Sequence, residues 1–114
     1  MSNEHLSERT DRIRQLNDQF RTLRADGSIL FAGDLGSEDV ERRLKVLEAV
    51  AKFQAFDEGN DGYGEHDYAT FEFDGERFMF KIDYYDRTLE NGSDDPADPA
   101  KTTRVMTIFY ARDY

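Results

Sequence analysis

The 114-residue chain contains no cysteine and no long apolar run. The absence of cysteine excludes disulfide bonds, thiolate metal ligands and a cysteine nucleophile. A membrane-spanning helix needs about 18 or more consecutive apolar residues, and no such segment occurs. The first ten residues, MSNEHLSERT, lack the apolar core of a secretion signal. A cytoplasmic location without membrane contact is therefore expected.

Large aromatic side chains are abundant in a chain that is otherwise polar. Charged residues make up 35% of the sequence, but nine Phe and six Tyr provide bulky apolar groups for a core. The length is sufficient for one core but not for two. We expect a single domain over residues 1–114, with residues 1–6 as a flexible N-terminus.

The acidic residues are concentrated in the middle of the chain. Residues 57–98 contain 14 acidic and 3 basic side chains, whereas residues 1–56 contain 10 acidic and 9 basic ones. A negative field of this kind repels nucleic acid phosphates and attracts basic protein surfaces. The segment is therefore predicted to bind a basic surface of a protein and not to bind nucleic acid directly.

Two segments have the apolar spacing of amphipathic helices. The first spans residues 7–25, and Gly27 is placed to end it in a left-handed conformation. The second spans residues 37–54, and Ser37 is its predicted N-cap. Five basic side chains of the first helix are expected on its solvated surface: Arg9, Arg12, Arg14, Arg21 and Arg24.

Alternating apolar and polar residues predict a hairpin of strands 68–73 and 78–85, which turns at Asp74-Gly75. Residues 28–33 form a further short strand, and the C-terminal residues from Thr102 onward form a central one. The predicted fold is an α+β domain with two helices packed on one face of an antiparallel sheet, in the order α-β-α-β-β-β. Six side chains are candidates for the buried side of the sheet: Phe71, Phe73, Phe78, Phe80, Ile82 and Phe109.

His66 lies between two acidic residues, directly before a predicted strand. A carboxylate can orient an imidazole for general base catalysis. Neighbouring strand residues point to opposite faces, however, so Glu65 and Asp67 cannot both contact the ring. A structural role, in which His66 joins the glycine-rich loop to the hairpin, is favoured over catalysis. The alternative is an acid–base site that also includes Asp67, Lys81, Asp83 and Tyr85.

The carboxylates of the glycine-rich loop do not form a recognisable calcium site. The calcium-loop pattern, started at Asp57, requires an acidic or amide residue where Gly59 stands and a Glu where Tyr68 stands. No phosphate-binding glycine loop is present, and His5 and His66 are the only imidazoles available for zinc. No metal and no cofactor are expected.

Several motifs resemble a small bacterial protein family of unknown function. They are IRQLND (13–18), YGEHD (63–67), KIDYYD (81–86), GSDDPADP (92–99) and TTRVMTI (102–108). The resemblance covers nearly the whole chain. It implies no known activity or cofactor, but members of this family often occur on mobile genetic elements. That association raises the expectation of a role in conflict between such elements and their hosts.

Two functions remain open from the sequence, beside a third interpretation in which the acidic residues only increase solubility and the function lies elsewhere. The first is a non-enzymatic acidic protein, acting as a nucleic-acid mimic that inhibits a restriction or CRISPR system by binding its basic groove. The second is the small enzyme described above, with the connection after the hairpin as a lid. In the first interpretation the expected binding residues are Asp57, Glu58, Asp61, Glu65, Asp86, Glu90, Asp94, Asp95 and Asp98.

Overall fold

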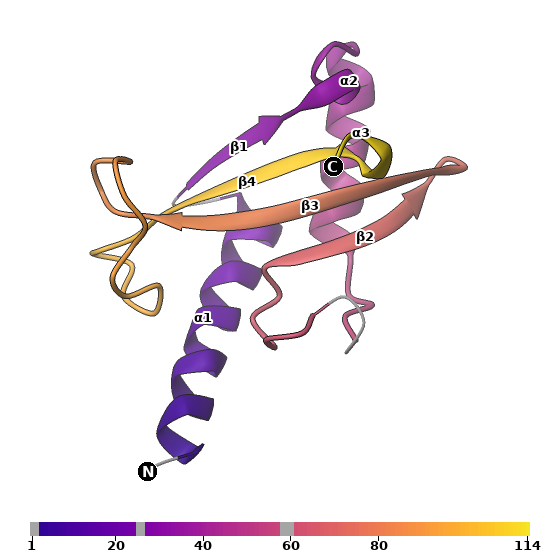
Figure 1. The fold of residues 1–114 in the computed structure, drawn as a ribbon. Helices are drawn as coiled ribbons and strands as arrows, with labels where there is room; N and C mark the ends of the chain where they lie inside the picture. Colours follow the sequence, from indigo (N-terminus) through magenta and orange to yellow (C-terminus); the bar gives the residue numbers. More distant parts are fainter. Residues whose placement is uncertain (1–2, 25–26, 58–60) are drawn as a thin grey trace.

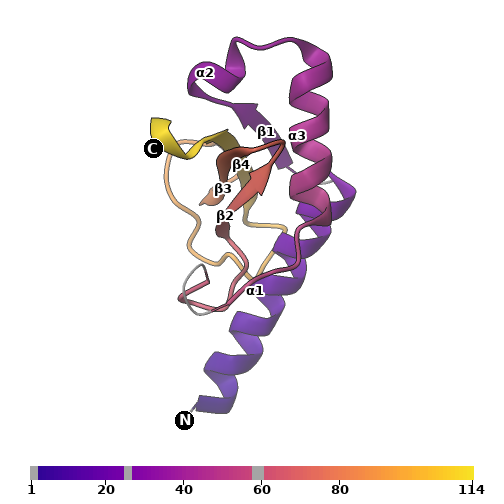
Figure 2. The same ribbon diagram turned by 90° about the vertical axis from the view of Figure 1, so that its right-hand side faces the viewer.

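The computed structural model describes residues 3–24, 27–57 and 61–114 and has an α+β fold. Helices α1 and α3 lie on one side of a four-stranded sheet, and the opposite side of the sheet is open (Figures 1 and 2). No helix in the described part of the chain has the length and apolar character needed to cross a membrane. The elements in chain order are α1 (Asn3–Leu23), β1 (Gly27–Phe31), α2 (Gly33–Gly36), α3 (Val40–Lys52), β2 (Tyr68–Phe73), β3 (Glu76–Tyr85), β4 (Thr103–Tyr110) and the 3-10 turn η1 (Ala111–Asp113).

The sheet is mixed, so the prediction of an antiparallel sheet was wrong for one of its pairs. Its order is β1-β4-β3-β2; the pairs β2–β3 and β3–β4 are antiparallel, but β1 and β4 are parallel. The parallel pair arises because the chain crosses from β1 through α2 and α3 to the far edge of the sheet, and only then returns through the hairpin to β4. The predicted central position of β4 is confirmed, since it pairs on both sides. The short helix α2 was not predicted.

Helices α1 and α3 begin at other residues than predicted, and for α3 the N-cap explains the difference. Helix α1 begins at Asn3, within the predicted flexible segment, of which residues 1 and 2 lie outside the described part. Helix α3 begins at Val40 because the Asp39 carboxylate accepts a hydrogen bond from the Arg42 N–H at 2.8 Å. Ser37, the predicted N-cap, instead follows the end of α2.

Gly27 does not end α1 as predicted. Arg24 adopts the left-handed conformation there, with φ 58°, and its N–H donates to the Phe20 carbonyl. Gly27 is the first residue of β1, where a Cβ atom would lie 2.4 Å from the Arg104 carbonyl oxygen. A glycine is needed at this position for the close approach of the two strands, not for a positive φ.

The hairpin turn has the geometry predicted for Asp-Gly. Asp74 and Gly75 have φ values of 54° and 76°, and Phe73 pairs with Glu76 across the two-residue loop. Positive φ at both central residues is the mark of a type I′ turn, which matches the right-handed twist of the strands. Arg42 of α3 holds the tip of the hairpin by ion pairs to Asp74 and Glu76, both at 2.8 Å.

The main core lies between the sheet and the two long helices. It contains Phe78, Phe80 and Ile82 as predicted, together with Met106 and Ile108. Phe71 belongs to this core too, and Phe73 packs against it while only partly buried.

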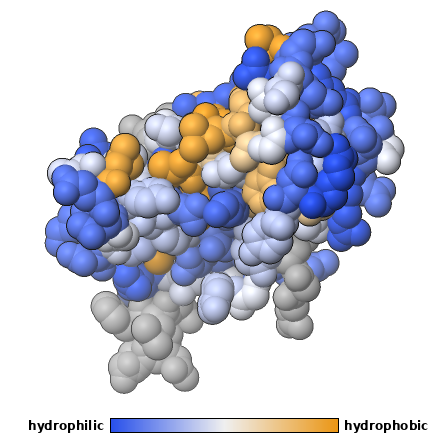
Figure 3. Space-filling model, turned by 45° about the horizontal axis from the view of Figure 1, so that its top comes forward, coloured by the Kyte–Doolittle hydropathy of each residue, from blue (hydrophilic) through white to orange (hydrophobic). Residues whose placement is uncertain are grey.

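Phe109 lies on the opposite face of the sheet from the main core. Its strand neighbours Ile108 and Tyr110 occupy the core positions, and Phe109 pairs instead with Met79. It is nevertheless only 4% exposed, and the C-terminal Tyr114 stacks on it with ring centroids 5.9 Å apart. Figure 3 shows hydrophobic residues among hydrophilic ones on this side of the molecule, where Leu30 is half-exposed.

Arg21 is buried, contrary to the prediction that it lies on the solvated surface of α1. Its Nη1 donates to the carbonyl oxygens of Val50 and Phe53, both at 2.7 Å, and it is 3% exposed. These carbonyls lie at the C-terminal end of α3, where the usual i+4 donors are missing; the Val50 carbonyl also accepts from the Phe53 N–H at 3.3 Å. One arginine of α1 therefore caps α3, and the contact fixes the two helices relative to each other.

Candidate functional site

His66 contacts two carboxylates, one on α1 and one in the glycine-rich loop. Its Nδ1 lies 2.9 Å from Asp18 Oδ1 on α1, and its Nε2 lies 3.4 Å from Asp61 Oδ2. The ring stacks on Phe56 at 3.8 Å, and the backbone N–H donates to Asp61 at 2.9 Å. The imidazole thus contacts one carboxylate of α1 and one of the glycine-rich loop, and neither Glu65 nor Asp67 is among them.

A buried polar network lies beside His66 and joins α1, β3 and β4. The Tyr84 hydroxyl donates to Glu65 Oε1 at 2.7 Å and accepts from Asn17 Nδ2 at 2.8 Å. Arg104 Nε donates to Asn17 Oδ1 at 2.7 Å, and its guanidinium lies 5.1 Å from the Tyr84 ring centroid. Burial, together with the Glu65 carboxylate, raises the pKa of Tyr84 above its usual value. The phenol therefore remains protonated and acts as a donor.

Asp67 is the most perturbed carboxyl group of the candidate site. Burial raises its pKa to about 6, and the nearby charges of Glu65, Asp61 and Asp83 act in the same direction. Its Oδ1 is buried without a hydrogen-bond partner among the described residues. A carboxyl group of this kind exchanges its proton close to neutral pH, which is a property of general acids and bases.

The five residues of the alternative catalytic site do not gather on one side of the sheet. His66 and its partner Asp18 lie on the helix side, whereas Lys81, Asp83 and Tyr85 alternate with the core residues of β3 and point to the open side. On that side Lys81 Nζ forms an ion pair with Asp83 at 3.5 Å. The sheet therefore separates Lys81 and Tyr85 from the imidazole.

The connection from β3 to β4 contains the acidic loop, which we define as residues 86–98. Its aspartates accept hydrogen bonds from nearby backbone N–H groups: Asp86 from Glu90, Asp95 from Ala97 and Asp98 from Ala100. Although partial burial opposes it, the bonds to Asp86 hold the pKa of its carboxyl group below the usual value. Three carboxylates of the loop thus help to fix its own backbone.

The predicted binding residues of the glycine-rich loop and those of the acidic loop differ in solvent exposure. Asp61 and Glu65 turn inward toward His66 and Tyr84, and only 8% of the Asp61 side chain is exposed. Asp57 is exposed, and Glu58 lies outside the described residues. In the acidic loop the side chains are exposed or half-exposed, namely Asp86, Glu90, Asp94, Asp95 and Asp98.

Asn17, Asp18 and Arg104 are the members of the site that sequence reasoning missed. Asn17 belongs to the IRQLND motif and is fully buried, on the face of α1 that also buries Ile13, Phe20 and Arg21. A polar residue at a core position of an amphipathic helix was the available signal for it. In the described ranges, no group of three or more His, Cys, Asp or Glu side chains is arranged to hold a metal ion.

Comparison with known proteins gives one finding. The family DUF3768, described as a protein of unknown function, matches residues 10–113. Neither a curated protein nor a solved structure matches the chain. The matched range covers the C-terminal two thirds of α1, the sheet, the glycine-rich loop and the acidic loop, so all the motifs described above lie within one family domain.

Proposed function

The chain belongs to the DUF3768 family of unknown function, and from the geometry of its surface we propose that it is a non-catalytic acidic interaction protein. The acidic loop binds the basic surface of a nucleic-acid-binding protein. Within that class, the proposed partner is a component of a host defence system such as restriction or CRISPR. The protein would then act as a mimic of nucleic acid and an inhibitor.

The single observation that supports this proposal is the anchoring of the loop carboxylates. Asp86, Asp95 and Asp98 each use a side-chain oxygen to bind a backbone N–H group of the loop. A charge excess that serves only solubility needs no fixed positions, whereas imitation of a row of phosphates does. Anchored carboxylates lose little conformational entropy on binding, which favours a specific complex.

The loop charges are also available to a partner. Asp95 pairs with Arg9, but no ion pair in the described part of the chain involves Asp86, Glu90, Asp94 or Asp98. By contrast, Glu41 and Glu48 of α3 each pair with a lysine one turn away. The unpaired carboxylates can therefore form new ion pairs without breaking existing ones.

Capture of a partner from bacterial lysate, followed by competition with duplex DNA, tests the proposal. The immobilised protein should retain a nucleic-acid-binding protein, and added duplex DNA should release it because both ligands occupy the same basic groove. The double variant Glu90→Gln/Asp94→Asn should capture less of it. Glu41→Gln/Glu48→Gln removes the same charge from α3 and is the matched control. Retention that is unaffected by DNA and by the loop variant would contradict the proposal.

One observation favours the enzyme as a second candidate. Asp67 combines a pKa near 6 with a buried oxygen that has no partner in the described residues. His66 lies next to it in the chain and contacts Asp18. An acid–base activity that is lost in Asp67→Asn, while partner capture is retained, would favour this candidate over the interaction protein.

A further inference from the structure

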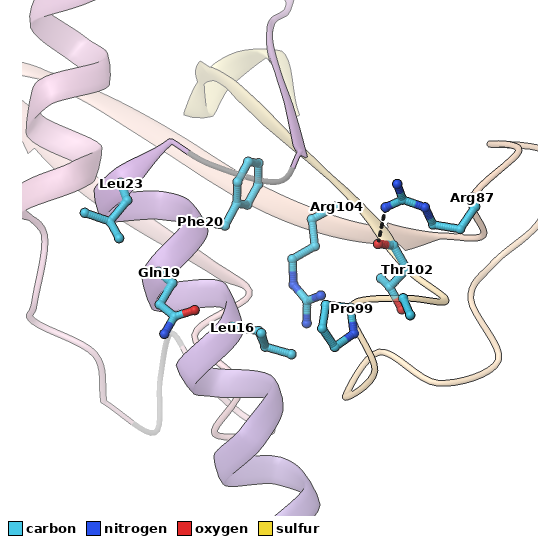
Figure 4. A pocket seen from close by; sticks show the side chains of 9 residues that line it. Leu16, Gln19, Phe20, Leu23, Arg87, Pro99, Thr102 and Arg104 are labelled. Carbon is cyan, nitrogen blue, oxygen red and sulfur yellow. Dashed lines mark hydrogen bonds between the residues drawn. The ribbon is translucent and has the colours of Figure 1, made fainter.

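A cavity of about 460 Å³ lies between α1 and the connection from β3 to β4. Its volume is within the range of small-molecule sites. Figure 4 shows side chains of α1 on one side of this cavity and those of the connection and β4 on the other. The lining residues are Leu16, Gln19, Phe20, Leu23, Arg87, Pro99, Ala100, Thr102 and Arg104.

The charge of this cavity is opposite to that of the protein. The chain has a net charge of −10, but the lining contains two arginines and no acidic residue. Arg104 is in the cavity wall, and Arg87 is exposed at the mouth, where its Nη1 donates to the Thr102 carbonyl at 3.3 Å. A concave site lined by cations attracts anions, since its walls exclude water and weaken screening.

Arg104 is a buried cation without an ion-pair partner among the described residues. It is 4% exposed, and its Nε and Nη2 donate to neutral oxygens of Asn17 and Pro96 at 2.7 and 2.6 Å. Its Nη1 has no hydrogen-bond partner in that part of the chain. Buried guanidinium groups are normally paired with an anion, because removing the charge from water is unfavourable.

The rest of the wall is apolar and is open to solvent at one edge. Leu23 is 70% exposed although it lies on the apolar face of α1, and Leu16 and Phe20 continue the same surface inward. In Figure 4 the Arg104 side chain points from β4 toward α1, and its guanidinium lies between Leu16 and Pro99. The cationic and apolar parts therefore face one common space.

We propose that this cavity binds a small organic anion, with its carboxylate or phosphate group at Arg104 and Arg87 and its apolar part against Leu16, Phe20 and Leu23. Guanidinium groups recognise both kinds of oxyanion through paired N–H donors. Gln19 at the edge provides an amide for a polar group of the ligand. This site is independent of the partner proposed for the acidic loop.

An NMR titration of the intact ¹⁵N-labelled protein tests the proposal with three probes: hexanoate, hexyl phosphate and neutral hexanamide. Both anions should shift the amide signals of Gln19, Leu23, Thr102 and Arg104 in a saturable manner, and hexanamide should bind at least about tenfold more weakly. The comparison of the two anions identifies the favoured head group. Equal binding of hexanamide, or shifts scattered over the surface, would overturn the proposal.

Two variants at the mouth of the cavity, each with a matched control, address the same site without removing buried contacts. Arg87→Gln should weaken anion binding at least threefold, and Leu23→Asp, which adds a negative charge to the wall, at least tenfold. The controls Arg77→Gln and Leu44→Asp change exposed residues of the same types elsewhere and should bind as the wild type does. Affinities that are unchanged in both cavity variants, with folding verified by the same spectra, would contradict the assignment.

Discussion

Asn17 and Arg104, separated by 87 residues, form a hydrogen bond of 2.7 Å in the interior of the protein. Asn17 is fully buried on α1, and Arg104 is nearly so on β4. The Asn17 amide also donates to the Tyr84 hydroxyl and to the Glu65 carbonyl, so a single side chain satisfies polar groups from three other segments. This arrangement attaches α1 to the sheet at the level of the YGEHD motif.

Replacement of Asn17 by leucine should destabilise the protein by about 2–4 kcal/mol. The loss of the amide leaves Arg104 Nε and the Tyr84 hydroxyl without one of their partners, and each unsatisfied buried group costs about 1–3 kcal/mol. Urea denaturation at pH 7 measures the effect. The exposed Gln15→Leu on the same helix is the control and should change stability little. Equal effects of the two changes would contradict the role assigned to the network.

The second prediction concerns the backbone and the ring of His66. His66→Ala removes the contacts with Asp18, Asp61 and Phe56 and should cost about 1–3 kcal/mol. His66 also has φ 56°, a conformation that asparagine tolerates better than alanine. His66→Asn should therefore be less destabilising than His66→Ala in thermal unfolding. Equal effects of the two variants, or the opposite order, would contradict a contribution of the left-handed backbone conformation at this position.

Stability should depend on pH through Asp67. Its pKa is raised in the folded state, so folding favours the protonated form, and the ionised form is penalised above about pH 6. Asp67→Asn removes this penalty and should stabilise the protein by about 1–2 kcal/mol at pH 7.5, after allowance for partial solvent exposure. The gain should shrink as the pH falls from 6 toward 4. Denaturation of both proteins at pH 4.5 and 7.5 checks this, and a gain that is larger at low pH would contradict it.

Backbone strain alone should determine the effect of replacing Gly75. Its φ is 76°, and a Cβ atom at this position would meet no other atom within 4 Å. Gly75→Ala should therefore cost about 1 kcal/mol through the unfavourable left-handed conformation. Gly62→Ala is the control, because a Cβ there makes only an ordinary contact and the φ is not positive. Identical melting temperatures of the two variants would argue against the type I′ turn.

The sequence pattern predicted the hairpin, because its strands and turn are determined by neighbouring residues. The hairpin and its Asp74-Gly75 turn follow from alternation and from the positive φ that glycine allows. The parallel pairing of β1 with β4 depends on contacts between Gly27 and Arg104, which lie far apart in sequence. Such long-range register leaves no local signature, so the sequence predicted a sheet but not its mixed character.

The sequence drew attention to His66 but not to its partner on α1. His66 was expected to join the glycine-rich loop to the hairpin, whereas its partner Asp18 resembles an ordinary surface residue of a helix. Arg21 was assigned to the surface for the same reason. Both residues take their roles from the packing of α1 against the end of α3, which helical periodicity does not reveal.

The central claim is that the exposed charges of the acidic loop bind a basic surface. The most direct test is the affinity for the captured partner as a function of salt, measured for the wild type, Glu90→Gln/Asp94→Asn and the control Glu41→Gln/Glu48→Gln. Two exposed ion pairs of about 0.2–1 kcal/mol each predict a roughly two- to thirtyfold loss for the loop variant, together with a weaker salt dependence. The control should bind as the wild type does. Equal affinities of the two variants, or a complex indifferent to salt, would contradict the claim.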